Sequence, residues 1–212
     1  MREELIMLPK PTVKPIFPIP TVHSHLSRDF TDEEISFINE IGKKTVKNEG
    51  NSNSYDNYVL EHPALVGIKE ELMHVVRFWF TDVYFNKTIE PYITQSWLNW
   101  TTKNQYHHKH THSNSIVSGV LYIHGLNERI DFERNAYQQI KITPDNEDWY
   151  NEYNNESTWV STPPGKILLF PSGVTHSVER KQTDELRVSL AFNVFVRGTL
   201  GKASSLTELR LE

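Results

Sequence analysis

The spacing of hydrophobic residues along the chain changes near residue 90. Before that point it is helical: apolar side chains recur every three or four positions in two segments, which predicts two amphipathic helices. The first begins at Thr31, because Thr31 and Glu34 have the spacing of a capping box. The second is predicted over residues 63–84. Between them, residues 48–57 are rich in Asn and Ser, and we expect a polar loop there.

From residue 90 onward the hydrophobic positions alternate with polar ones or form short runs, which is typical of β-strands. We expect strands over residues 92–101, 116–123, 166–170 and 187–197. One face of the last strand carries Arg187, Ser189, Ala191, Asn193 and Phe195. Helices followed by many evenly spaced strands predict an α+β fold whose strands form a sandwich or a barrel.

The chain length of 212 residues suits one domain with a sizeable core. We expect residues 1–90 to form an N-terminal arm and supporting helices, residues 91–200 the strand-rich core, and residues 201–212 a C-terminal tail. The arm contains five prolines in residues 9–20 and is predicted to be extended. Residues 143–158 are polar, acidic and rich in Tyr, so we expect a surface loop over one rim.

The composition of the chain argues against several classes of function. The net charge of −5 argues against a nucleic-acid partner, because binding to phosphates needs a basic surface. The chain has no cysteine, which excludes thiol catalysis and leaves nitrogen and oxygen as metal ligands. No apolar stretch reaches membrane-spanning length, and the first residues do not have the pattern of a secretory signal. We therefore expect a cytoplasmic protein without a membrane partner.

Four of the ten histidines fall within six consecutive residues. In an extended segment, His110 and His112 point to the same face and can bind one ion together. His176 follows a predicted strand and can join them if the strands form a roll. The spacing therefore predicts a metal site at these three residues, although a solvated His-rich loop is the alternative. We expect His107 and His108 to lie at the rim or in solvent.

Arg187 and Ser189 share a face of the last predicted strand. A guanidinium binds a carboxylate through two parallel hydrogen bonds, and a nearby hydroxyl can add a third. If this face lies inside the fold, the buried charge needs an anionic partner. That partner is either a dicarboxylate ligand or an acidic residue of the protein itself.

Four blocks of sequence resemble the Fe(II)/2-oxoglutarate-dependent oxygenase superfamily, and more closely the small oxygenases of marine bacteria and their phages on its prolyl-hydroxylase-like branch. The blocks are His110-x-His112 and residues 118–122, 170–178 and 185–193. They cover roughly residues 92–197 in the expected order. The resemblance implies a double-stranded β-helix, or jelly roll, supported by the N-terminal helices.

The resemblance also implies a site and a reaction. Fe(II) would be held by the three histidines named above, and the distal carboxylate of 2-oxoglutarate by Arg187, Ser189 and Tyr122. Further pocket candidates are Asn99, Ser118 and Asn193. The implied activity is that of a dioxygenase that uses dioxygen, hydroxylates its substrate and releases succinate and CO2. No catalytic residue is implied beyond the metal centre.

Position 112 departs from the superfamily pattern, in which a His-x-Asp or His-x-Glu pair is usual. A neutral imidazole supplies no negative charge to the metal, whereas a carboxylate does. The carboxylate could instead come from elsewhere in the chain, and Asp131 is the alternative ligand, with Glu133 beside it. We favour His112 because its spacing matches directly.

The implied substrate is a protein or peptide side chain such as proline, or a small molecule. The Pro-rich arm and the aromatic loop at residues 149–159 could frame a peptide groove. In a phage-encoded protein the location would be the host cytoplasm, and a homodimer is one of the assemblies open to the chain.

Two rival interpretations remain. In the first, the chain is a three-histidine cupin that does not use 2-oxoglutarate and acts as an oxygenase, an isomerase, or a metal or sugar binder. Pro171, Gly173 and His176 fit a cupin motif, but the glutamate expected after His112 is missing, and a cupin has no use for the Arg-x-Ser pair. The other interpretation is a non-catalytic jelly-roll module, which predicts no tight iron site.

Overall fold

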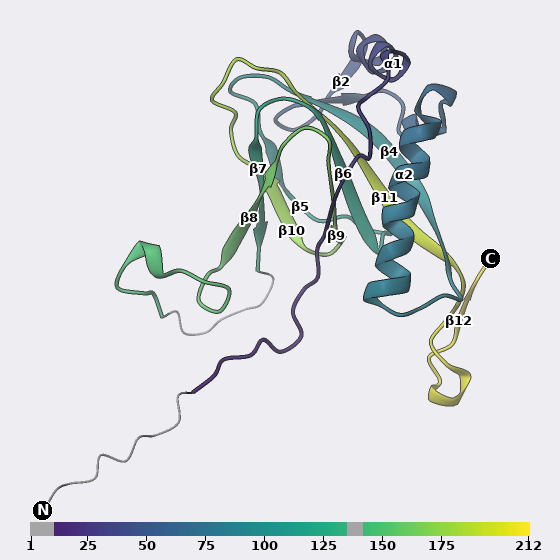
Figure 1. The fold of residues 1–212 in the computed structure, drawn as a ribbon, viewed down its shortest axis with the longest axis vertical. Coiled ribbons are helices and arrows are strands. Elements are labelled where there is room, and N and C mark those ends of the chain that lie inside the picture. The colour runs from purple at the N-terminus through teal and green to yellow at the C-terminus, as the bar shows by residue number, and fades with distance from the viewer. Residues whose placement is uncertain (1–10, 135–141) are drawn as a thin grey trace, which may run out of the picture.

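The computed structural model describes residues 11–134 and 142–212. Two antiparallel sheets face each other and form a double-stranded β-helix, and the two α-helices cover the outer face of the larger sheet (Figure 1). The predicted α+β jelly roll with N-terminal helices is confirmed. The first ten residues, which include the start of the predicted arm, lie outside the described residues. Residues 11–19 are exposed and lead to the first strand.

The first helix begins where the sequence predicts, and the second predicted segment is divided into three helical types. Helix α1 (Asp32–Gly42) starts with a complete capping box: Thr31 Oγ1 accepts from the Glu34 backbone N–H, and the Glu34 side chain accepts from that of Thr31. Helix α2 (Val66–Phe78) is preceded by the 3₁₀ turn Pro63–Leu65 and followed by the π turn Trp79–Val83. Among the described residues, no helix is long and apolar enough to cross a membrane.

The larger sheet has the strand order β1-β9-β6-β11-β4-β3-β2, and β12 pairs with β11. Its strands are β1 (Val22–His25), β9 (Lys166–Pro171), β6 (Val117–His124), β11 (Arg187–Leu200), β4 (Glu90–Thr101), β3 (Ser52–Ser54), β2 (Thr45–Lys47) and β12 (Leu209–Leu211). The four predicted strands are confirmed as β4, β6, β9 and β11, which are adjacent in this sheet. The short strands β2 and β3 extend it, and β3 lies within residues 48–57, where a loop was expected.

The smaller sheet has the order β5-β10-β7-β8. Its strands are β5 (His107–His110), β10 (Thr175–Val178), β7 (Glu128–Glu133) and β8 (Ser157–Thr162). The connection from β7 to β8 contains the predicted polar insertion and a short 3₁₀ turn, Glu147–Trp149. Most of the insertion's described side chains are exposed, as expected for a loop over the rim.

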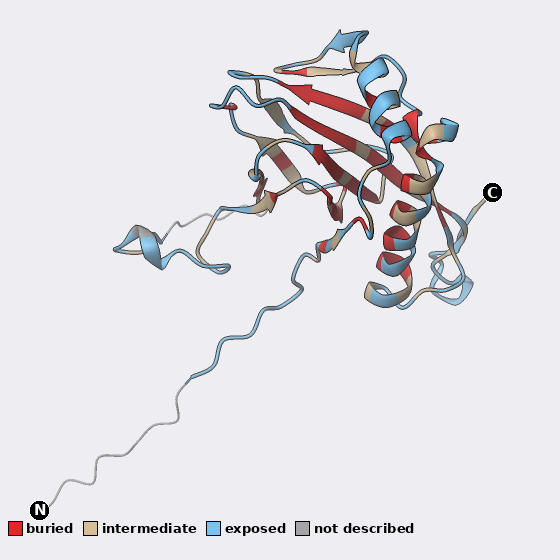
Figure 2. Ribbon diagram, turned by 45° about the horizontal axis from the view of Figure 1, so that its top comes forward, coloured by how far each residue is buried: buried red, intermediate tan, exposed pale blue. Residues whose placement is uncertain are grey.

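The strands of the larger sheet are largely buried (Figure 2), and the side chains of β11 alternate between two buried regions. One set of β11 side chains, including Val188 and Leu190, packs against α2 in the main hydrophobic core. The other set points between the sheets and includes Arg187 and Ser189. A smaller apolar cluster lies there too, formed by Tyr122, Ile130, Phe132, Leu168 and Phe170. The fold therefore places a charged and a hydroxyl side chain inside the roll.

Candidate active site

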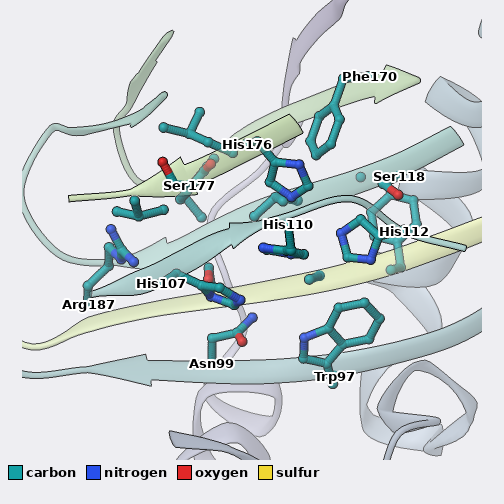
Figure 3. Close-up of a pocket in the computed structure, with 18 residues that line it drawn as sticks. Trp97, Asn99, His107, His110, His112, Ser118, Phe170, His176, Ser177 and Arg187 are labelled. Carbon is teal, nitrogen blue, oxygen red and sulfur yellow. The ribbon is translucent and has the colours of Figure 1, made fainter. Parts of the chain in front are cut away.

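A cavity between the two sheets gathers most of the predicted site residues (Figure 3). Its polar and aromatic lining includes Trp97, Asn99, His107, His110, His112, Ser118, Tyr122, Phe170, His176, Arg187 and Ser189. Imidazoles gather at one end of this cavity and Arg187 lies apart from them (Figure 3).

Three histidines converge from two segments of the chain. His110 ends β5 and pairs in register with His176 of the neighbouring strand β10. His112 follows two residues later, where its backbone N–H donates to the Ser172 carbonyl over 2.9 Å. One ring nitrogen of each histidine lies within 4.8 Å of those of the other two. The structure therefore brings the three predicted ligands together.

Hydrogen bonds orient two of these rings. His110 Nδ1 donates to the His108 carbonyl over 2.8 Å, and His176 Nδ1 donates to the Val174 carbonyl over 3.0 Å. A carbonyl only accepts, so each Nδ1 carries the proton and each Nε2 keeps a free lone pair. This is the usual arrangement of histidines that bind a metal through Nε2.

The three rings are also kept neutral. Burial lowers the pKa of His176 to about 3 and that of His112 to about 4, and burial also lowers the pKa of His110. At neutral pH their lone pairs are therefore available. Neutral imidazoles are suitable ligands for Fe(II), Zn(II), Cu(II) and Ni(II).

Arg187 lies in the same cavity with a side chain that is 6% exposed. Its Nη1 donates to Glu128 Oε2 and its Nη2 to Thr101 Oγ1, each over 3.3 Å, while Nε is buried without a hydrogen-bond partner. Glu128 also pairs with Lys181, whose side chain is 1% exposed. The acidic partner considered from the sequence is therefore present, but one carboxylate is shared by two buried cations.

Ser189 is flanked by two other predicted pocket residues. In the sheet register it stands beside Asn99 on one neighbouring strand and beside Tyr122 on the other. Burial raises the pKa of Tyr122, so its phenol remains a hydrogen-bond donor. Asn99 Oδ1 is buried and has no hydrogen-bond partner. Orphaned polar atoms on Asn99 and Arg187 are features that a bound ligand would satisfy.

The remaining predicted residues differ in their positions. Ser118 lines the cavity and donates to Asn193 Oδ1 over 2.9 Å, so Asn193 supports Ser118 without lining the cavity itself. Asp131 lies outside the cavity, and its Oδ1 is 3.0 Å from Arg129 Nε. Burial raises the Asp131 pKa. The geometry therefore favours His112 over Asp131 as the third ligand.

The sequence predicted that His107 lies at the rim or in solvent, and for this residue the prediction is wrong. Its ring lines the cavity, stacks on His110 with centroids 4.8 Å apart, and lies 3.3 Å from the Asn51 amide. Burial, with smaller contributions from the neighbouring histidines, lowers its pKa to about 3. His108 does not line the cavity. Ring nitrogens of His107, His108 and His110 lie within 4.8 Å of one another and form a second candidate metal group.

Comparison with known proteins agrees with this geometry. Residues 95–193 match the model of a family described as "Putative 2OG-Fe(II) oxygenase". The matched segment contains the three histidines, Arg187 and Ser189. No curated protein matches the chain.

Solved structures of similar fold include three proteins from different bacteria. An oxidoreductase of the 2OG-Fe(II) oxygenase family from Burkholderia pseudomallei is 14% identical, with a TM-score of 0.54 over 82% of this chain and 83% of that one. HygX from Streptomyces hygroscopicus, with nickel and 2-oxoglutarate bound, is 12% identical, with a TM-score of 0.57 over 83% and 82%. A Pseudomonas putida prolyl-4-hydroxylase is 13% identical, with a TM-score of 0.52 over 82% and 92%. At these identities the structures show the fold alone.

The sequence match and the fold point to the same class. Residues 95–193 match the 2OG-Fe(II) oxygenase family model, and the described residues share the fold of a structure from that family. The family match indicates an oxygenase that uses Fe(II) and 2-oxoglutarate, and it supports neither the cupin nor the non-catalytic interpretation.

Proposed function

We propose that this oxygenase is a hydroxylating dioxygenase whose metal ligands are His110, His112 and His176, and that Arg187 binds the distal carboxylate of 2-oxoglutarate with help from Ser189 and Tyr122. The observation that carries the proposal is one cavity with three converging imidazoles and, apart from them, a buried guanidinium.

The residues present fit both groups. Two of the three imidazoles have Nδ1 engaged by a carbonyl, which leaves Nε2 for a metal. Arg187 and Lys181 share the single carboxylate of Glu128, so this end of the cavity carries a net positive charge. The unpartnered Arg187 Nε would be satisfied by an added carboxylate oxygen.

Bound Fe(II) would supply the oxidative chemistry that couples decarboxylation of 2-oxoglutarate to succinate and CO2 with hydroxylation of the substrate. The protein's contribution is positioning. Arg187, Ser189 and Tyr122 fix one end of the cosubstrate, and the buried aromatic ring of Phe170, 4.7 Å from the His176 ring, helps to exclude water. No residue of the described cavity is needed as a general acid or base.

A second cavity, of about 580 Å³, is our candidate for the substrate site. The N-terminal arm contributes Ile19 and Thr21 to its wall, and the insertion between β7 and β8 contributes Tyr150. Phe170 lines both this cavity and the histidine cavity, so a side chain placed here lies next to the proposed metal centre.

We propose a protein or peptide side chain, such as proline, as the substrate. The extended arm and the insertion frame the second cavity as they would frame a peptide segment. Among the structural neighbours, one is a prolyl-4-hydroxylase and another, HygX, is known with hygromycin B bound, so a small molecule is the competing candidate.

The test is succinate formation by purified protein supplied with Fe(II), 2-oxoglutarate and oxygen, with and without proline-containing peptides. We expect peptide-stimulated turnover that Arg187→Ala abolishes. Arg197→Ala is the matched control, because Arg197 is an exposed arginine toward the other end of the same strand. Absence of succinate from protein that holds iron would refute the proposal.

The narrower assignments belong to the same proposal. The four sequence blocks support a place among the small oxygenases of marine bacteria and their phages. We also propose a single domain in the cytoplasm, or in the host cytoplasm if the gene is a phage's, and a homodimer as a candidate assembly.

A further inference from the structure

His107 lies along the path between the proposed metal ligands and Arg187. In Figure 3 its ring stands between Arg187 and His110, and it lines the same cavity as both. The ring stacks on His110 with an interplanar angle of 19°. A dianion that extends from the metal ligands to Arg187 therefore passes beside His107.

A chain of amides sets the hydrogen-bonding role of this ring. Asn48 Nδ2 donates to Asn51 Oδ1 over 3.0 Å, so the Asn51 amide directs its N–H group at His107. Asn51 Nδ2 then donates to His107 Nδ1 over 3.3 Å. Asn51 is 2% exposed, so bulk water does not compete for these bonds. Because Nδ1 accepts, the neutral ring carries its proton on Nε2.

This tautomer is opposite to that of the proposed ligands. His110 and His176 donate from Nδ1 and keep the Nε2 lone pair. In His107, Nε2 is an N–H donor and has no lone pair for a metal. The second group of neighbouring histidines, His107, His108 and His110, is therefore not a metal site in this arrangement.

We propose that His107 Nε2–H donates a hydrogen bond to 2-oxoglutarate, at the carboxylate nearer the metal, and that Asn51 is the positioning residue that maintains the donating tautomer. This inference rests on the proposed function, which places 2-oxoglutarate in the cavity. It adds a binding residue for an anionic keto acid at a site whose three proposed ligands are all uncharged. Loss of a hydrogen bond to a charged acceptor raises the dissociation constant roughly 10-fold or more.

The experiment measures 2-oxoglutarate binding to Ni(II)-loaded protein by calorimetry, which needs no turnover. His107→Phe keeps a stacked ring but removes both nitrogens, and we expect its Kd for 2-oxoglutarate to rise about 10-fold or more. His107→Gln keeps an N–H donor and should retain much of the affinity. Asn51→Leu should give a smaller loss. His108→Phe, in the same histidine run but outside the cavity, should bind like the wild type.

Ni(II) binding without 2-oxoglutarate gives the second measurement. Stoichiometry and affinity for Ni(II) should be unchanged in His107→Phe. Weaker Ni(II) binding by this variant would make His107 a ligand and overturn the proposal, and so would an unchanged Kd for 2-oxoglutarate or equal losses in the Phe and Gln variants. If instead the wild type binds Ni(II) but no 2-oxoglutarate, the proposed function itself fails.

Discussion

Replacing Glu128 with Gln tests whether the buried positive charge is built to receive a second anion. Glu128 is the shared partner of Arg187 and Lys181, whose side chains are 6% and 1% exposed, while its own is 19% exposed. Glu128→Gln keeps the size of the side chain and removes its charge. The two cations are then left without a carboxylate in the ligand-free protein.

The expected loss of stability follows from these exposures. Removing one partner of a fully buried ion pair costs about 3–5 kcal/mol. Glu128 is partly reached by solvent, which screens its charge, so we expect about 2–3 kcal/mol for Glu128→Gln. For a chain of this size that corresponds to a fall in Tm of roughly 5–10 °C.

Binding should change in the opposite direction. In the wild type, Glu128 competes with the distal carboxylate of 2-oxoglutarate for Arg187. Without that competition, the Ni(II)-loaded Glu128→Gln protein should bind 2-oxoglutarate more tightly and recover more of its Tm when the cosubstrate is added.

Urea unfolding of the metal-free proteins and calorimetry of the loaded proteins measure the two effects. Glu133→Gln is the control, because Glu133 lies on the same strand and its partner Lys109 is exposed. We expect little change in its stability. If Glu128→Gln unfolds like the wild type and binds 2-oxoglutarate no more tightly, Glu128 is not the counter-ion of this end of the cavity.

Three further predictions concern the ligands and the packing. His112→Asp should retain Ni(II) binding, and Asp131→Ala should bind Ni(II) like the wild type. Loss of Ni(II) binding in Asp131→Ala would show that the assignment of His112 as the third ligand is wrong. In the metal-free protein, the free energy of unfolding should fall as the pH drops from 6.5 towards 4, because unfolded histidines take up protons while His112 and His176, with pKa values of about 4 and 3, stay neutral in the fold. Urea unfolding at pH 7 and pH 5 measures this slope, which His112→Asn should reduce; an equal slope in that variant contradicts the cause. Gly119→Ala should destabilise the protein by about 1–3 kcal/mol, because the added Cβ would lie 2.2 Å from Phe192 Cζ. Gly173→Ala meets nothing within 4 Å and should unfold at the same urea concentration as the wild type; equal effects at both glycines would refute the packing explanation.

Local patterns account for the parts of the fold that the sequence predicted. The capping box needs only Thr31 and Glu34, three positions apart in one turn, so its residues are sufficient to locate the start of α1. Alternation along β11 separates the helix-facing side chains from Arg187 and Ser189 because the sheet is buried on both faces. The pairing of His110 with His176 could be predicted because strands distant in sequence become neighbours in an antiparallel roll.

The features that the sequence did not predict share one cause: each depends on contacts between residues that are far apart in the chain. Strands β2 and β3 have no hydrophobic alternation, and β3 forms by pairing with the edge of β4. Their hairpin carries Asn51, so the buried position of His107 could not be recognised from its neighbours in sequence. Glu128 lies 59 residues from Arg187, and nothing in its local sequence distinguishes it from a surface acid.

The position of two proposed ligands inside one short histidine run affects how metal and folding are coupled. Residues 107–112 keep four imidazoles close together even when the chain is unfolded, whereas His176 joins them only after β10 pairs with β5. We therefore expect divalent ions to bind both the denatured and the native chain. Binding to the denatured chain reduces the stabilisation that the metal gives to the native state. Thermal shifts in excess Ni(II) will understate the native affinity. During synthesis, the run is also complete 64 residues before His176 is added, so an ion can be chelated before the roll has closed around it.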